Sequence, residues 1–154
     1  MAHKKFLNDY FTGKGYNSDS RGELYNDDPR LGDARLCGTT ASLSGLEAGQ
    51  YEANADKIDQ AIACDLMLHG YLLAQSGIPV LYSGDEIGQT NDYTYKNDPD
   101  KCADSRYLHR GNFPWDKVEN KDPVAMKIFD ALRHMEDILS LIHISEPTRR
   151  SYIS

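Results

Sequence analysis

A short apolar run that leads directly into two carboxylates constrains this chain more than any other stretch. Residues 78–82, Ile-Pro-Val-Leu-Tyr, are apolar at consecutive positions, and glycines flank them on both sides. This pattern predicts a strand covered on both faces, as in the parallel sheets of α/β proteins. Gly84 allows a sharp turn, and Asp85 and Glu86 follow at once. Because α/β enzymes keep their chemistry at the carboxyl ends of parallel strands, the stretch predicts a functional edge.

Residues 54–76 predict a long helix that feeds this strand. Its apolar residues recur at helical spacing, and they are Ile58, Ala61, Ile62, Leu66, Leu68, Leu72 and Leu73. The helix becomes apolar nearly all round toward its end, which predicts deep burial there, and we expect His69 within it to be structural. A helix followed by a buried strand is half of a βαβ unit, yet no parallel partner strand is visible elsewhere in the sequence.

The remaining chain alternates short helices with long polar segments. Residues 3–12 predict the end of a helix, Thr39 or Thr40 is expected to cap a short one, and Asp122 with Pro123 starts a final helix with apolar spacing as far as Leu139. Residues 16–33 and 89–121 are rich in turn formers and predict long loops.

Composition excludes several classes of function. A length of 154 residues suits one domain, and the formal net charge of -7 argues against a nucleic-acid surface. No run approaches a membrane span, and the N-terminus lacks the apolar core of a signal peptide. The three widely separated cysteines favour a reducing, cytoplasmic setting. No histidine lies at a recognised metal-ligand spacing and the acidic turns match no calcium loop, so we expect neither metal nor cofactor.

Several blocks of the sequence resemble one enzyme family. Residues 77–86 (Gly-Ile-Pro-Val-Leu-Tyr-Ser-Gly-Asp-Glu) closely resemble the eighth-strand motif of the α-amylase family, glycoside hydrolase family 13. Residues 84–92 and 104–110 (Asp-Ser-Arg-Tyr-Leu-His-Arg) are similar to its amylosucrase-like branch. The same holds for residues 35–43, for the loop 21–26 and for Leu-Arg-His-Met at 132–135. The resemblance runs from about residue 5 to residue 139.

The resemblance implies an α/β fold that is part of a TIM (β/α)8 barrel. A whole barrel takes roughly 250 residues, so we expect only its last helices, its eighth strand and the long loops beside it. Family members place an Asp nucleophile, a Glu acid/base and a stabilising Asp after the fourth, fifth and seventh strands. In the match these positions lie upstream of Met1, so no residue of this chain is assigned a catalytic role. The intact relative would be a retaining enzyme that hydrolyses or transglucosylates sucrose or α-glucans.

The resemblance also implies a substrate-facing wall. It would comprise Asp85, Glu86, Asn91, Asp92, Arg106, Arg110, Arg21, Tyr25 and Arg35. Each type of residue has an ordinary alternative role. The carboxylates can fix the loop by binding backbone amides or an arginine, the arginines can bridge to carboxylates, and Asn and Asp are common turn formers.

The end of the sequence departs from the family. Residues 141–154 resemble the translation of a sequencing-library adapter. We therefore expect residues 1–139 to be a C-terminal fragment of the catalytic domain and residues 140–154 to be an artefactual, disordered tail, with Pro147 ending any helix.

Two functions compete: a fragment of a retaining glucosidase or transglucosylase, and a non-catalytic carbohydrate-binding or inert fragment. A third is complementation, in which the chain docks onto the missing part of the barrel. Because a lone strand leaves its edges unpaired, we expect the isolated chain to be marginally stable or prone to aggregate.

Overall fold

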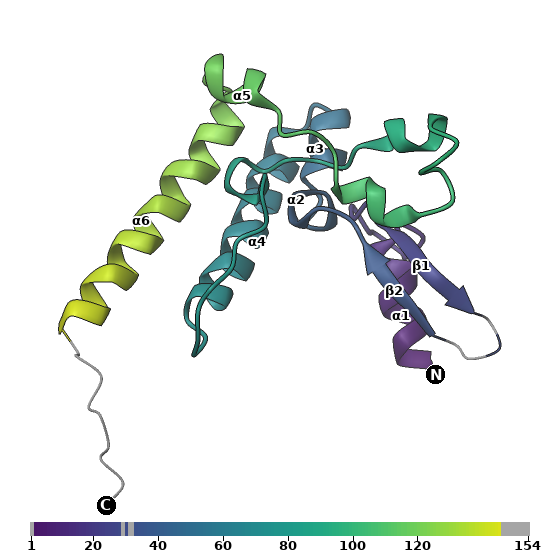
Figure 1. Cartoon of the computed structure of the whole chain (residues 1–154), viewed down its shortest axis with the longest axis horizontal. Helices are drawn as coiled ribbons and strands as arrows, with labels where there is room; N and C mark the ends of the chain where they lie inside the picture. The colour runs from purple at the N-terminus through teal and green to yellow at the C-terminus, as the bar shows by residue number, and fades with distance from the viewer. Residues whose placement is uncertain (1, 29, 31–32, 146–154) are drawn as a thin grey trace, which may run out of the picture.

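The computed structural model describes residues 2–28, 30 and 33–145 and leaves residues 1, 29, 31–32 and 146–154 outside the description. The described chain is mostly helical, with one two-stranded sheet (Figure 1). In chain order the elements are α1 (Ala2–Phe11), β1 (Glu23–Asp28), β2 (Asp33–Cys37), α2 (Thr40–Leu43), α3 (Leu46–Tyr51), α4 (Ala55–Leu73), the 3-10 turns η1 (Asp85–Ile87), η2 (Tyr93–Asn97) and η3 (Ser105–His109), α5 (Trp115–Glu119) and α6 (Pro123–Ser145).

The core lies where α4 and α6 pack together beneath α2 and α3 (Figure 1). Its buried apolar residues are Ala41, Leu46, Ala61, Ile62, Ile128 and Leu132. Both long helices begin at side-chain caps, because the Asn54 side chain accepts from the Lys57 amide at 3.2 Å and Asp122 accepts from the Ala125 amide at 2.9 Å. The predicted helix after residue 54, the helix start at Pro123 and the Thr39 cap of α2 are thereby confirmed.

The η1 turn is pressed directly onto this core. Gly88 ends the turn with φ of 59°, and a Cβ atom added there would lie 2.5 Å from Ile128 Cδ1 and 3.2 Å from Leu46 Cδ2. Only glycine combines the left-handed backbone with this close approach. Gly88 therefore lets η1 pack closely against α6 and α3.

A β-hairpin replaces much of the loop expected over residues 16–33. Strands β1 and β2 pair antiparallel, with Glu23 opposite Cys37, Leu24 opposite Leu36 and Tyr25 opposite Arg35. The loop prediction was wrong because the strands are polar and half-exposed, so backbone pairing rather than an apolar pattern defines them.

The strand predicted over residues 78–82 is not formed in the described chain. No backbone group of residues 78–81 bonds to another backbone group there, and the exposed fractions of Ile78, Val80 and Tyr82 are 92%, 75% and 51%. A strand exists only through hydrogen bonds to a neighbour, and no described segment supplies one. The deep burial expected near the end of α4 holds for one face only: Leu73 is buried, whereas Met67 and Tyr71 are 63% and 69% exposed.

The last helix extends beyond the family-like sequence. Helix α6 continues to Ser145, so residues 140–145 are helical, contrary to the disordered tail expected from residue 140. The other expectations for the tail, including a helix end at Pro147, concern residues outside the described part. Among the described helices, none is both long and apolar enough to cross a membrane.

We predict that Ile128→Ala lowers the free energy of unfolding by about 2–5 kcal/mol, because Ile128 is fully buried and truncation leaves a cavity. Ile138→Ala is the matched control on the same helix, with Ile138 45% exposed, and should cost less than about 1 kcal/mol. Urea unfolding followed by circular dichroism gives both values. Equal losses for the two variants would contradict this assignment of the core.

Candidate functional site

The carboxylate of Glu86 fixes its own loop. Gly84 precedes η1 with φ of 99°, and its amide donates to Glu86 Oε2 at 2.7 Å. The Gln89 amide donates back to the Gly84 carbonyl at 2.9 Å. Of the two roles left open for Glu86, this geometry matches the binding of a backbone amide.

Asp85 lies beside a buried histidine of α4. The two nitrogens of His69 face different carboxylates: Nδ1 is 3.3 Å from Asp65 Oδ2, and Nε2 is 3.6 Å from Asp85 Oδ2. The side chains of Asp65 and His69 are only 1% and 4% exposed. The neighbouring carboxylates of Asp65 and then of Asp85 raise the pKa of His69 from 6.5 to about 10, against the opposing effect of burial.

Asn91 joins three separate segments of the chain. Its side-chain Oδ1 accepts from the Thr39 backbone amide at 2.9 Å, and its side-chain Nδ2 donates to the Arg21 carbonyl. Its backbone amide donates to Ser42 Oγ at 2.9 Å. These bonds hold the loop after η1 against the start of α2. The polar groups of Asn91 are thus hydrogen-bonded to other parts of the protein.

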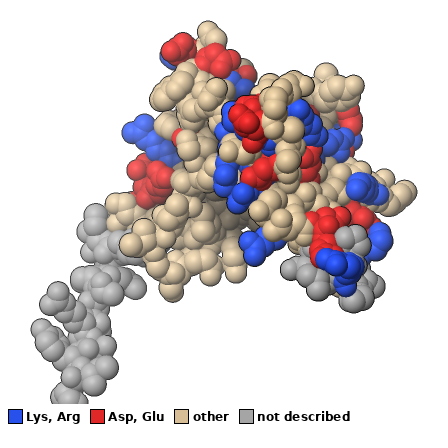
Figure 2. All heavy atoms as spheres, turned by 45° about the vertical axis from the view of Figure 1, so that its right-hand side comes forward, with Lys and Arg blue, Asp and Glu red and all other residues tan. Residues whose placement is uncertain are grey.

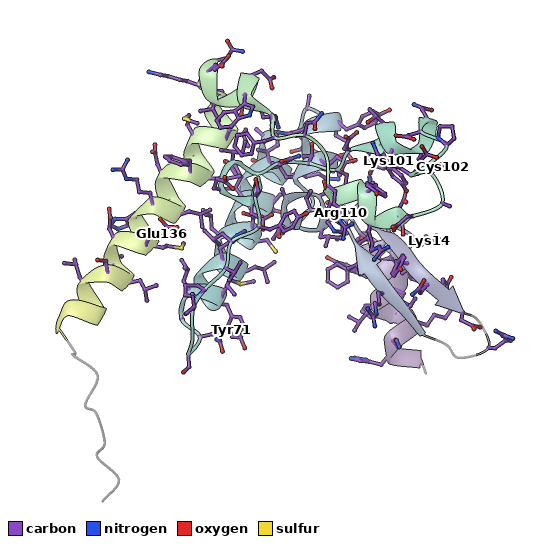
Figure 3. All side chains as sticks on the ribbon, in the orientation of Figure 1. Lys14, Tyr71, Lys101, Cys102, Arg110 and Glu136 are labelled. Carbon is purple, nitrogen blue, oxygen red and sulfur yellow. The ribbon has the colours of Figure 1, made fainter. Side chains whose placement is uncertain are left out.

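Asp92 and Arg110 line one polar cavity of about 180 Å³ between η2 and η3. Its other lining residues include Thr94, Tyr95, Asp98, Lys101 and Tyr107. Asp92 caps η2 by accepting from the Thr94 amide at 2.8 Å. Two cations flank the Tyr107 ring, with Lys101 Nζ 5.8 Å and Arg110 Cζ 5.9 Å from its centroid. Figure 3 labels Lys101 and Arg110 on this lobe, beside the hairpin.

Arg106 is turned toward the hairpin. Its Nε and Nη2 bind the Asp104 carboxylate, with Nη2 2.7 Å from Oδ2, and its guanidinium lies 4.6 Å from the Tyr25 ring centroid. The bond from Arg106 lowers the pKa of Asp104 to about 2. Ser105 Oγ donates to the Leu24 carbonyl at 3.0 Å and further ties η3 to β1. Arg106 and Tyr25 therefore stabilise the contact between η3 and the hairpin.

The two remaining predicted residues lie apart from the cavity. Arg21 Nη1 donates to the Ser20 carbonyl at 3.0 Å. Arg35 is exposed on β2, opposite Tyr25. The nine predicted residues thus do not form one wall: only Asp92 and Arg110 share the cavity between η2 and η3. A second hollow of about 230 Å³ is lined by Asn91 and Asp92, with Gln89 and Lys117.

Charged side chains of both signs are interspersed over the lobe that carries the cavity (Figure 2). The surface formed by the end of α4 and the segment after it differs, because residues 66–84 contain no Lys, Arg, Asp or Glu. The exposed apolar side chains of this uncharged surface are Met67, Leu68, Tyr71, Leu72, Ile78, Val80 and Tyr82. The molecule therefore separates a polar hollow from an apolar face.

Sequence reasoning missed the partners of His69. The available signal was Asp65, the one carboxylate between residues 60 and 84, placed four residues before His69 on a helix. Residues four apart on a helix are neighbours, so an Asp and a His at this spacing on a buried face are expected to form an ion pair. The contact with Asp85 depends on how η1 docks, which no local spacing encodes.

A scan against models of known protein families finds no match for this chain. The family resemblance of its motifs remains a prediction.

We predict that the stability of the chain depends on pH through His69. Because the pKa of His69 is higher in the folded state than its ordinary 6.5, its stabilisation is fully present below about pH 6.5. The stabilisation falls as the pH rises further and is lost as the pH passes about 10. Urea unfolding across this range should show the decline, and His69→Gln should flatten it. His134→Gln, at an exposed position of α6, is the control. A wild-type curve as flat as that of His69→Gln would contradict the prediction.

Proposed function

We propose that this chain is part of a retaining α-glucosidic glycoside hydrolase or transglucosylase of the α-amylase family, similar to its amylosucrase-like branch. In this proposal the chain supplies the eighth strand of a (β/α)8 barrel and sugar-facing loops, and the reacting carboxylates belong to a part of the barrel outside this sequence. The three free cysteines are compatible with a cytoplasmic location.

The observation that carries the proposal is the side-chain chemistry of the cavity between η2 and η3. Arg110 and Lys101 bring donors, Asp92 brings an acceptor, and Tyr107 brings an aromatic face. Sugars present hydroxyl groups that donate and accept, together with apolar ring faces, and such a lining suits them. A volume of about 180 Å³ is below the roughly 300–1,000 Å³ of pockets that enclose drug-sized ligands. It suits one subsite of a longer glucan or disaccharide site.

The exposed apolar segment 78–82 gives independent support for a larger barrel. Ile78, Val80 and Tyr82 are exposed at alternate positions, whereas Pro79 and Leu81 between them are half-buried. A strand that faced water would carry polar residues at the outward positions. Because the backbone of residues 78–81 is also unpaired within the described part of the chain, the segment has the features of a strand whose neighbouring strands and covering layer are supplied elsewhere.

The alternative is a non-catalytic carbohydrate-binding or inert fragment. Glu86, Asn91, Arg21 and Arg106 favour it, because each is engaged with protein groups. The two readings differ in whether sugar binds at the cavity and in whether any bond is cleaved.

Titration calorimetry of the purified chain with sucrose and with maltooligosaccharides separates these functions. We expect weak binding without release of glucose or fructose, and about tenfold weaker binding by Arg110→Ala, which removes donors from the cavity. Arg133→Ala, on the exposed face of α6, should bind like the wild type. Release of glucose or fructose would overturn the placement of the reacting groups outside this chain. The absence of binding by the folded chain would favour the inert fragment.

The apolar segment predicts self-association of the isolated chain. Exposed apolar strands pair with one another when their own partners are missing. We expect light scattering over a concentration series to show mass increasing with concentration, and Ile78→Lys with Val80→Lys to suppress the increase. Tyr51→Lys is the control, since Tyr51 is 91% exposed but belongs to α3. A wild-type chain that stays monomeric throughout would count against an unpaired strand.

A further inference from the structure

His69 presents both of its ring nitrogens to oxygen acceptors. Nδ1 lies 2.9 Å from the backbone oxygen of Asp65 and 3.3 Å from its Oδ2, while Nε2 lies 3.6 Å from Asp85 Oδ2. A neutral imidazole carries one N–H and leaves its other nitrogen as an acceptor, whereas the imidazolium ion carries two N–H donors. Nδ1 is within hydrogen-bonding distance of the Asp65 backbone oxygen, whereas Nε2 lies at ion-pair distance from Asp85. Only the imidazolium places a positive charge between the two carboxylates. The geometry therefore selects the charged form of His69.

The buried carboxylate of Asp65 also requires a positive charge on His69. Its side chain is 1% exposed, and among the described residues neither carboxylate oxygen has a hydrogen-bond partner. A buried carboxylate without compensation is strongly unfavourable. The imidazolium of His69, at 3.3 Å, is the cation that compensates it.

The surroundings of His69 reinforce this assignment. Helix α4 contributes Asp65 and η1 contributes Asp85, whereas α6 brings the apolar Met135 to the neighbouring Gly70. The η3 turn contributes His109, which interacts with Asp85 and whose own pKa is lowered, mainly by burial and next by Arg110. Two carboxylates thus face His69, and they raise its pKa.

We propose that His69 is a positioning residue for Asp85: anchored by Asp65 as a buried imidazolium, it holds the Asp85 carboxylate in a fixed orientation at the start of η1. Asp65 and His69 lie four residues apart on the same helix, and this spacing fixes the direction in which Nε2 faces Asp85. Asp85 comes from a turn bounded by Gly84 and Gly88, both with positive φ. The loop alone would leave its carboxylate free to rotate, and the charge of His69 restrains it.

This inference goes beyond the proposed function, because it concerns what orients Asp85 and holds whether or not a sugar binds. Sugar binding and the state of His69 are measured separately, so the failure of one leaves the other standing.

Nuclear magnetic resonance of the full chain labelled with ¹⁵N-histidine tests the proposal directly. We expect both ring nitrogens of His69 to be protonated at about pH 8, with the signals identified by their loss in His69→Gln. Asp65→Asn and Asp85→Asn should each lower the titration midpoint of His69 by about one pH unit or more. Asp130→Asn is the matched control, because Asp130 precedes His134 by the same four residues on the exposed face of α6. A wild-type His69 with only one protonated nitrogen at this pH would overturn the proposal.

A second measurement distinguishes positioning from a purely structural role. In His69→Gln, whose side chain can still donate hydrogen bonds but carries no charge, the side-chain carboxyl ¹³C signal of Asp85 should shift and broaden. The methyl signals of Ile128 and Leu132 should stay in place, since both belong to the core. An unchanged Asp85 signal in the folded variant would show that His69 does not orient this carboxylate. The protonation state of wild-type His69 decides the proposal even if Asp65→Asn or Asp85→Asn fails to fold.

Discussion

The packing of α4 against α6 is the contact on which the rest of the structure depends. It buries Ile62, Ile128 and Leu132. Ile128, together with Leu46 of α3, also forms the surface on which η1 rests through Gly88. The position of η1 in turn places Asp85 beside His69. A single apolar interface thus determines both the core and the polar cluster next to it. A substitution that loosens this interface would also change the position of Asp85, because Gly88 of the same turn packs on Ile128.

Helix α4 also presents an apolar surface that the described chain does not cover. One face of α4 is buried, whereas Met67, Leu68, Tyr71 and Leu72 are exposed. The segment that follows α4 includes residues 78–81, whose backbone is unpaired within the described chain. Water is a poor solvent for this surface, and unpaired backbone adjoining it favours pairing with another strand. The combination gives a physical reason for the proposal that the chain belongs to a larger barrel.

The sequence predicted the parts of the fold that depend on local pattern. Helices α4 and α6 followed from apolar spacing, and α6 also from the cap at Asp122. The hairpin did not, because polar strands such as β1 are defined by pairing. The strand at 78–82 was predicted from its composition, yet a strand needs a neighbour that the described chain lacks. For the site, Asp92 and Arg110 do share a cavity, whereas the contact of His69 with Asp85 depends on tertiary docking.

Amide hydrogen exchange of the isolated chain, at a concentration where it is monomeric, tests most directly the proposal that residues 78–82 form a strand only when neighbouring strands are supplied. We expect the amides of Ile78, Val80, Leu81 and Tyr82 to exchange near the rate of an unstructured peptide, while those of Ile62 and Ile128 are protected by their helices. Protection of the 78–82 amides comparable to that of the helical core would show that the segment is already paired within this chain and would overturn the proposal.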